Sequence, residues 1–440
     1  MYKKLSFLWF IMGLGGQLQV LFSLSMTEIL VLVMAPCLVF AEIPHMQRTG
    51  VIKFFWISIL LFCGCVVSLI VNHAQFYQVI RGVSITGLIV CSTVVMHYML
   101  RNCPQGVKWH FVGGMLSGII CIFVFQRSVE VTVAGGADVD TIMSGKMFWI
   151  QRLSSVVLTP LLAFYLRMPF AYCVGAPLFL AFFSILTSTS GRSASLSFLG
   201  AAAIVMIGGK KRKTMIRLGK HFALIFCCAV VGIFLIKAMY QWAAVNNYLG
   251  DEARIKYEQQ TAGGSGIVQL LIAGRADAFR GLLAVADSPI IGQGYWARDT
   301  EGYRERFLAK YGSLEDYEHY ARYMSYMHKN GMMVDKGIPC HSHITSFWLW
   351  YGLPGLLFWL YAIYVMFRFL RQDIAVIPQW YYWLAAAMPG TVWNIFFSPF
   401  QSRVGFPLFV IGMLIARAVR LGRYRLPFEM IREIEENERK

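Results

Sequence analysis

Charged residues are scarce in this chain. Of its 440 residues only 14% are Asp, Glu, Lys or Arg, whereas 57% are hydrophobic and 15% are aromatic. Because soluble domains carry about a quarter charged residues, this composition argues against a soluble globular protein. The bulk composition instead indicates a membrane protein.

The sequence also lacks any Cys-x-x-Cys motif, although it contains ten cysteines. Nine of them lie in or beside apolar segments, and only Cys340 falls in an extended polar region. This distribution argues against a disulfide framework and against a cysteine zinc site. Internal repeats and low-complexity segments are absent as well, which argues against a repeat architecture.

Long apolar runs cover most of the chain. A spanning helix needs about 20 mostly apolar residues, and by this measure we expect an all-α polytopic membrane protein with about twelve transmembrane helices. Two pairs, the first with the second and the sixth with the seventh, are separated only by short turns, so either pair can instead be one broken or re-entrant element. The predicted spans are 5–24, 28–44, 53–72, 82–100, 109–126, 150–167, 169–189, 194–209, 221–240, 344–367, 378–398 and 404–421.

Basic residues indicate the orientation of these spans. If the N-terminus lies inside, the short loops on the cytoplasmic side are rich in Lys and Arg, and the block 210–220 alone holds six. Both termini are then expected in the cytoplasm. The block is short and lies next to the membrane, so it favours contact with anionic membrane lipids, and we expect no nucleic-acid partner.

One extended polar region interrupts the apolar pattern between the ninth and tenth predicted spans. It holds eleven Lys or Arg and twelve Asp or Glu, a nearly neutral mixture that favours a folded loop on the outer surface. Within it, apolar spacing predicts a helix over 274–289, ended by Asp287-Ser-Pro, and another over 313–329. The predicted organisation is nine helices in 1–240, a large and mostly helical periplasmic loop in 241–343, three helices in 344–421, and a cytoplasmic tail in 422–440.

A candidate anion site begins the eighth predicted span. In "TSTSGRSASLSF", Ser190, Arg192 and Ser193 stand at a helix N-terminus that faces outward, where free backbone N–H groups favour negative charge. Phosphate fits the fork of a guanidinium group best, and a diphosphate needs a second such partner, which Arg275 or Arg280 of the loop would supply. The alternative is that each arginine pairs with a loop carboxylate or reaches lipid headgroups.

Two histidines stand at the mouth of the tenth predicted span, in "HSHITSFWLWYGLPG" (341–355). Imidazole titrates near neutrality and can accept a proton from a hydroxyl as a new bond forms. The alternatives are a solvated or helix-capping role and a metal site. Since His341 and His343 are two residues apart, they do not align on one helix face, and we expect no metal.

The order of these features resembles the O-antigen ligase and O-antigen polymerase superfamily. In that family a histidine is followed eleven residues later by a Gly-x-x-Gly turn, and His341 lies eleven residues before Gly352 of "GLPG". The resemblance therefore gives the catalytic role to His341, with His343 only as a supporting residue. The resemblance also implies that Arg192, in "SGRSA", and Arg275 correspond to the family's functional arginines. Arg275 lies in a segment that ends at a Gly-x-Gly (292–294).

The resemblance implies a glycosyltransferase of the bacterial inner membrane whose active site faces the periplasm. Members move a glycan from a polyprenyl diphosphate carrier, here undecaprenyl diphosphate, to an acceptor hydroxyl such as that of the lipid A core, without a metal, a nucleotide sugar or another cofactor. A repeat-unit polymerase, which uses the growing glycan as acceptor, is the alternative within the same chemistry. A membrane transporter or flippase is the alternative of a different class.

Overall fold

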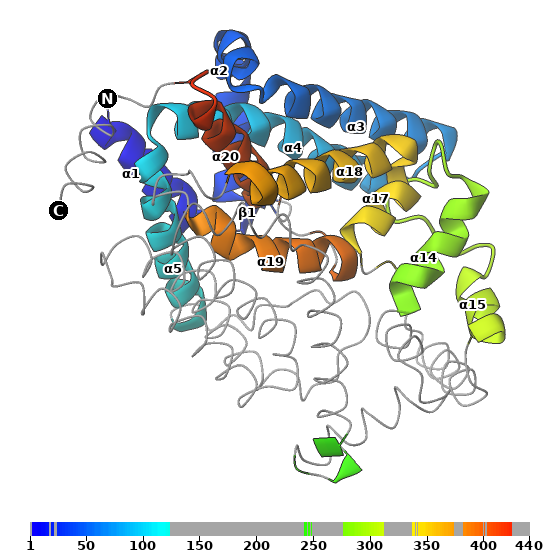
Figure 1. Ribbon diagram of the computed structural model, residues 1–440. Coiled ribbons are helices and arrows are strands. Elements are labelled where there is room, and N and C mark those ends of the chain that lie inside the picture. The colour runs from blue at the N-terminus through cyan, green and yellow to red at the C-terminus, as the bar shows by residue number, and fades with distance from the viewer. Residues whose placement is uncertain are drawn as a thin grey trace.

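Helices dominate the computed structural model (Figure 1). It describes residues 2–16, 19–21, 24–123, 242–243, 245–246, 248, 276–311, 337–338, 340, 342–373, 382–398, 400 and 403–424. The first of these ranges form α1 (Tyr2–Leu14), β1 (Gln19–Leu21), β2 (Leu24–Ser25), α2 (Met26–Thr49), α3 (Ile52–Val71), α4 (Phe76–Asn102), the 3-10 helix η1 (Pro104–Gly106) and α5 (Val107–Phe123). The later ranges form α14 (Ala276–Asp287), α15 (Tyr303–Tyr311), α17 (His343–Tyr351), α18 (Leu353–Arg368), the π-helical turn η3 (Phe369–Asp373), α19 (Tyr382–Phe397) and α20 (Gly405–Arg420).

Four segments of the described chain are long and apolar enough to cross a membrane. They are α2, α3, α4 and the stretch Leu353–Gln372, which consists of α18 and the first four residues of η3. The predicted spans 28–44, 53–72 and 82–100 are confirmed as single helices, and the protein is membrane-embedded. The predicted spans 109–126, 378–398 and 404–421 correspond to the helices α5, α19 and α20, which have 17, 16 and 16 residues. The predicted spans between 150 and 240 lie outside the described residues.

The prediction of one span over 5–24 is wrong. Helix α1 ends at Leu14, and the chain continues into an antiparallel pair of short strands, β1 and β2. Glycines at 15 and 16 follow the helix directly, and glycine is a poor helix former because it loses the most backbone entropy on folding. The Thr27 hydroxyl then donates to the Met12 carbonyl, which fixes the start of α2 against the end of α1.

The prediction of one span over 344–367 is also wrong, because Gly352 separates α17 from α18. Its backbone has φ 65° and ψ −148°, a region that only glycine adopts at low cost. Pro354 stands in the first turn of α18, where its missing N–H is tolerated. The apolar run is thus a short helix, a sharp break, and then the spanning helix (Figure 1).

Helix α2 begins at a capping box. Ser25 Oγ accepts from the Glu28 backbone N–H (3.2 Å), and the Ser25 N–H donates to Glu28 Oε2 (2.8 Å), which satisfies two backbone donors that the helix leaves free. The same carboxylate lies 3.4 Å from Arg403 Nη1, just before α20. The cap therefore also ties the start of α2 to the start of α20.

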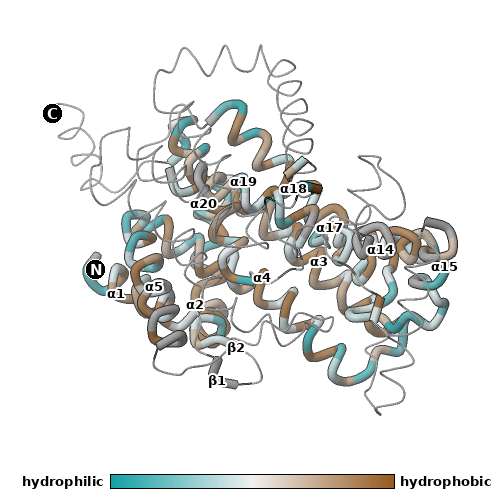
Figure 2. The backbone as a smooth tube through the Cα atoms, turned by 90° about the horizontal axis from the view of Figure 1, so that it is seen from below, coloured by the Kyte–Doolittle hydropathy of each residue, from teal (hydrophilic) through white to brown (hydrophobic). Residues whose placement is uncertain are grey.

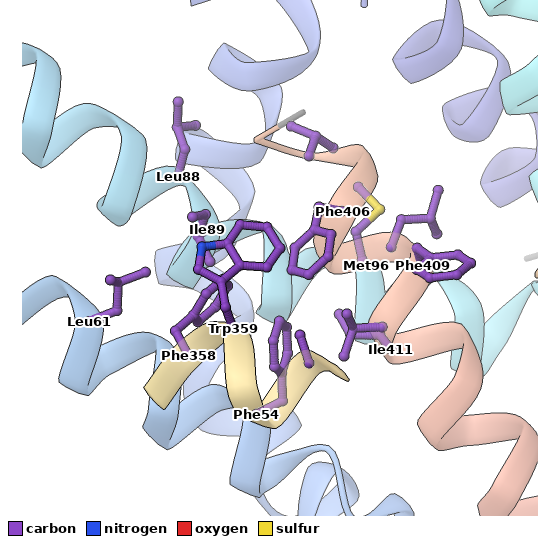
Figure 3. Close-up of a cluster of buried hydrophobic side chains, with 14 of the residues drawn as sticks. Phe54, Leu61, Leu88, Ile89, Met96, Phe358, Trp359, Phe406, Phe409 and Ile411 are labelled. Carbon is purple, nitrogen blue, oxygen red and sulfur yellow. The ribbon is translucent and has the colours of Figure 1, made fainter. Parts of the chain in front are cut away.

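The described core runs through most of the helices, and its part among α3, α4, α18 and α20 is rich in aromatic side chains. Phe54, Phe358, Trp359 and Phe406 are among its largest buried side chains, and the rings of Trp359 and Phe406 have centroids 4.6 Å apart (Figure 3). Figure 2 shows hydrophobic residues along these helices, as expected for elements that are apolar on both their core and lipid sides. The packing fixes α18, and through it the break at Gly352, against α3.

A buried charged cluster joins α2 to α4. Glu42 accepts from His97 Nδ1 (2.7 Å) and from Arg101 Nη2 (2.7 Å), and the other nitrogen of His97 lies 2.9 Å from Thr49 Oγ1. The side chains of Glu42 and His97 are 2% and 0% exposed. Because a buried charge is costly without a partner, these contacts hold the two helices in one register.

Candidate functional site

Most of the predicted site residues lie outside the part of the chain that the structure describes. Arg280 lies within α14, but its side chain is outside the described set, and His343 is described in full. The predicted residues outside the described ranges are Ser190, Arg192, Ser193, Arg275 and His341. The structure therefore bears on the site through the residues that neighbour these positions in the chain.

The residues on both sides of position 341 are held by hydrogen bonds. Ser342 caps α17, since its Oγ accepts from the Thr345 N–H (3.3 Å) and donates to the Ile395 carbonyl of α19 (3.1 Å). The Cys340 carbonyl accepts from Ser346 Oγ (3.1 Å). The polar first turn of α17 thus fixes the backbone that flanks the predicted catalytic histidine.

His343 lies in the aromatic core. Its ring centroid is 5.1 Å from that of Trp359 and 5.2 Å from that of Phe400, and the residue is 6% exposed. These contacts are those of a packed core side chain, on the buried side of the first turn of α17. The structure therefore gives His343 a packing role.

Helix α14 packs directly against the start of α17. The helix predicted over 274–289 is confirmed, with bounds Ala276–Asp287. A methyl group at Gly281 would lie 2.6 Å from Cys340 Sγ and 3.1 Å from Thr345 Cγ2, so the absence of a side chain at Gly281 lets the two segments approach closely. Gly281, which contacts Cys340, directly follows Arg280 in the chain, and Cys340 directly precedes His341.

The turn after α14 is bonded to the break between α17 and α18. Gln293 N–H donates to the Leu349 carbonyl (2.7 Å), Gly294 N–H to the Trp350 carbonyl (3.1 Å), and Leu353 N–H to the Ile290 carbonyl (2.9 Å). Gly292 and Gly352 both have positive φ, and a methyl group on Gly292 would lie 2.5 Å from the Gly352 nitrogen. The Gly-x-Gly segment and the "GLPG" turn, far apart in sequence, are therefore one packed unit.

Two polar residues near the end of α3 join this unit, and sequence reasoning missed both. Ser68 Oγ donates to the Trp350 carbonyl (2.7 Å) and accepts from the Gly294 N–H (3.1 Å). Asn72 Nδ2 donates to the Gly292 carbonyl (3.0 Å). The signal that could have found them is their spacing, because polar residues four apart at the end of an apolar run share one helix face.

A second hydrogen-bonded chain connects α14 to α15. Tyr303 donates to Asp287 Oδ2 (2.5 Å), while Gln293 Nε2 donates both to the Tyr303 hydroxyl (3.2 Å) and to the Ala284 carbonyl (2.6 Å). Burial, and then the bond to the Asp287 carboxylate, raise the pKa of Tyr303 above its ordinary value. The phenol therefore stays a donor at neutral pH and holds α15, a helix that the sequence did not predict, against α14.

Metal-ligating side chains do not gather in the part of the chain that the structure describes. Among those residues, no three His, Cys, Asp or Glu side chains lie close enough together to hold a metal ion.

No protein-family model matches this chain, and no curated protein matches it either. The O-antigen ligase and polymerase superfamily is therefore suggested only by the resemblance of sequence motifs.

Proposed function

We propose that the protein is a glycosyltransferase of the O-antigen ligase type. It transfers a glycan from undecaprenyl diphosphate to an acceptor hydroxyl, such as one of the lipid A core, at the periplasmic face of the bacterial inner membrane. The lipid tail of the donor explains why the site lies at the lipid–water boundary, its diphosphate explains the arginines, and the incoming hydroxyl explains the histidine. The reaction needs neither a metal nor another cofactor.

In this proposal His341 accepts the proton of the acceptor hydroxyl. The acceptor oxygen attacks the anomeric carbon from the face opposite the diphosphate, the anomeric C–O bond breaks, and the configuration inverts. Arg192 and Arg275, with Arg280, bind the diphosphate and stabilise the charge that it gains. A placed charge donor is worth about 10²–10³ in rate and a general base about 10²–10⁴.

The observation that carries the proposal is the contact between α14 and the start of α17. Gly281 follows Arg280 and approaches Cys340, which precedes His341. Arg275 directly precedes α14. Backbone positions that lead to the proposed diphosphate-binding and proton-accepting residues therefore belong to one packed unit, which supports their action on one substrate.

The position of this unit gives further support. Its backbone bonds reach Leu353, the first residue of one spanning segment, and its side-chain bonds reach Asn72, directly after another. A donor with a membrane-embedded tail and a polar headgroup presents its diphosphate at such a boundary.

A transfer assay tests the proposal. The purified protein in lipid nanodiscs is mixed with an undecaprenyl-diphosphate-linked glycan, lipid A core acceptor and EDTA, and the glycosylated acceptor is resolved by gel electrophoresis. We expect product with the chelator present and none with the His341→Ala variant. Product that requires added metal, or equal product from the variant, would contradict the proposal.

The two alternatives give different results in the same system. Elongated glycan that stays on the carrier lipid, with the lipid A core unmodified, would identify a repeat-unit polymerase. Movement of the lipid-linked glycan across a liposome membrane without any transfer would identify a transporter or flippase.

A further inference from the structure

The turn that follows α14, residues 288–292, exposes two large apolar side chains. Ile290 is 68% exposed and Ile291 is 39% exposed. They belong to the predicted loop 241–343, which holds eleven Lys or Arg and twelve Asp or Glu. Exposed apolar groups rimmed by polar residues indicate an interaction surface, so the position of the turn decides which partner covers them.

The exposed apolar face of α18 leads directly to this turn. The exposed large side chains of α18 recur every three or four residues, which places them on one side of a spanning helix. They are Leu353, Leu357, Leu360, Tyr364 and Phe367. The Leu353 N–H donates to the Ile290 carbonyl (2.9 Å), so Ile290 lies beside the first residue of this lipid-facing stripe.

The turn also lies at the level where two spanning segments end. Leu353 is the first residue of one segment, and α3 ends its apolar stretch at Val71. Asn72, the next residue, donates to the Gly292 carbonyl (3.0 Å). Bonds from both ends of the turn therefore hold it at the boundary of the apolar part of the bilayer.

Carbonyl groups of the turn and the Gly292 N–H have partners within the protein. The Pro289 carbonyl accepts from Trp348 Nε1 (2.9 Å), the Ile290 carbonyl from Leu353, and the Gly292 carbonyl from both Asn72 and Ser288 Oγ (3.0 Å). The Gly292 N–H donates to the Ser288 carbonyl (3.0 Å), and Pro289 has no N–H. Irregular backbone is tolerated at membrane depth only where its polar groups find internal partners, and tryptophan is enriched at this interface.

We propose that the turn 288–292 inserts into the acyl chains of the leaflet on its side of the membrane, with Ile290 and Ile291 in contact with lipid. The turn then anchors α14 to the membrane surface. The partner is the acyl region of bilayer lipid, because the lipid-facing stripe of α18 continues into the exposed side chain of Ile290. This inference does not depend on the glycosyltransferase proposal, and its test measures no activity.

Site-directed spin labelling tests the insertion. A keto amino acid introduced at position 290 carries the label, so all native cysteines are kept, and the full-length protein is placed in vesicles of phosphatidylethanolamine and phosphatidylglycerol. Power saturation in electron paramagnetic resonance compares collisions with oxygen, which concentrates in lipid, and with a water-soluble nickel chelate. Position 357 on the stripe of α18 is the lipid control, and position 301, a 60% exposed glutamate side chain of the same loop, is the water control.

We expect the label at 290 to match the label at 357, with oxygen accessibility well above nickel accessibility, and the label at 301 to show the reverse. A label at 291 gives an independent second reading with the same expected sign. Nickel accessibility at 290 and 291 equal to that at 301 would overturn the proposal. Low accessibility to both reagents would also overturn it, because it would mean that protein, such as a second copy of this chain, covers the turn.

Discussion

His343 illustrates, at the scale of the residue, how neighbouring histidines can have separate tasks. It packs between the rings of Trp359 and Phe400, whereas Ser342 caps α17 and Cys340 contacts α14. Position 341 lies between these last two residues. The structure thus gives His343 a packing role, whereas proton transfer by His341 belongs to the proposed function.

Alanine at the two histidines should separate these tasks. We expect His341→Ala to lower the transfer rate by about 10²–10⁴, the value of a general base, with little change in thermal stability. His343→Ala should keep much of the activity per folded molecule but lose about 2–5 kcal/mol through the cavity it leaves. Rates and melting temperatures of the two purified variants check this, and the reverse ranking of rates would show that the other ring is the base.

Replacement of Arg275 tests fork-shaped binding of the diphosphate. We expect Arg275→Lys to be nearly as harmful as Arg275→Ala, because lysine keeps the charge but cannot form two parallel hydrogen bonds. Complementation in membranes that lack the native protein measures both variants, with expression levels as the control. A lysine variant that kept most of the activity would rule out the bidentate contact.

The buried charge of Glu42 gives a prediction about stability alone. Glu42→Gln leaves Arg101 and His97 without their buried carboxylate, so we expect a loss of about 3–5 kcal/mol. The matched control is Glu301→Gln, because Glu301 pairs with Arg306 at 3.2 Å while both side chains are more than half exposed, and such pairs are worth about 0–1 kcal/mol. Thermal unfolding in one detergent compares the two variants, and similar losses would mean that the cluster does not stabilise the fold.

At the scale of the element, the break between α17 and α18 depends on one glycine. A methyl group on Gly352 would lie 2.0 Å from the Ile290 carbonyl oxygen, closer than any real contact. The break therefore determines the direction of α17 relative to α18. It also determines the position at which the turn 288–292 packs. Helix caps alone do not explain the break, because residues that follow α14, together with Ser68 of α3, form the hydrogen bonds that hold it.

Alanine at two left-handed glycines separates backbone strain from this close approach. Gly50 has φ 77° with nothing within 4 Å of an added methyl group, so Gly50→Ala should cost only about 1–2 kcal/mol for the left-handed conformation. We expect Gly352→Ala to cost at least about 3 kcal/mol and to displace α17. Unfolding measurements and limited proteolysis near residue 340 check the pair, and equal effects at both glycines would refute the packing argument.

At the scale of the whole molecule, composition and local pattern predicted the membrane-embedded helices and the helix α14. The apolar spacing of α14 and the stop at Asp287-Ser-Pro act within a few residues, so they can be read from the sequence. The hydrogen bonds of Ser68 to Gly294 and Trp350 cannot be read from the sequence. Ser68 is more than 200 residues away from both partners in the chain. The break at Gly352 was predicted only in part: the resemblance implied a Gly-x-x-Gly turn there, but the apolar residues on both sides of it led to one predicted span over 344–367.

The candidate site divides in the same way. Its candidate residues, a histidine at the start of a helix and arginines in the loop, could be identified from the sequence. The packing of Gly281 on Cys340 could not, because the only local sign of it is a glycine. Glycines that permit such approaches are indistinguishable in sequence from glycines in ordinary turns. The convergence of the arginines on the histidine remains a prediction.

The most direct test of the central claim is an experimental structure with the lipid-linked donor bound, in which distances from the diphosphate are measured. We predict guanidinium nitrogens of Arg192 and Arg275 within about 2.7–3.2 Å of diphosphate oxygens, and the imidazole of His341 on the opposite face of the anomeric carbon. A donor bound elsewhere, or an imidazole of His341 directed toward the cytoplasm, would contradict the account.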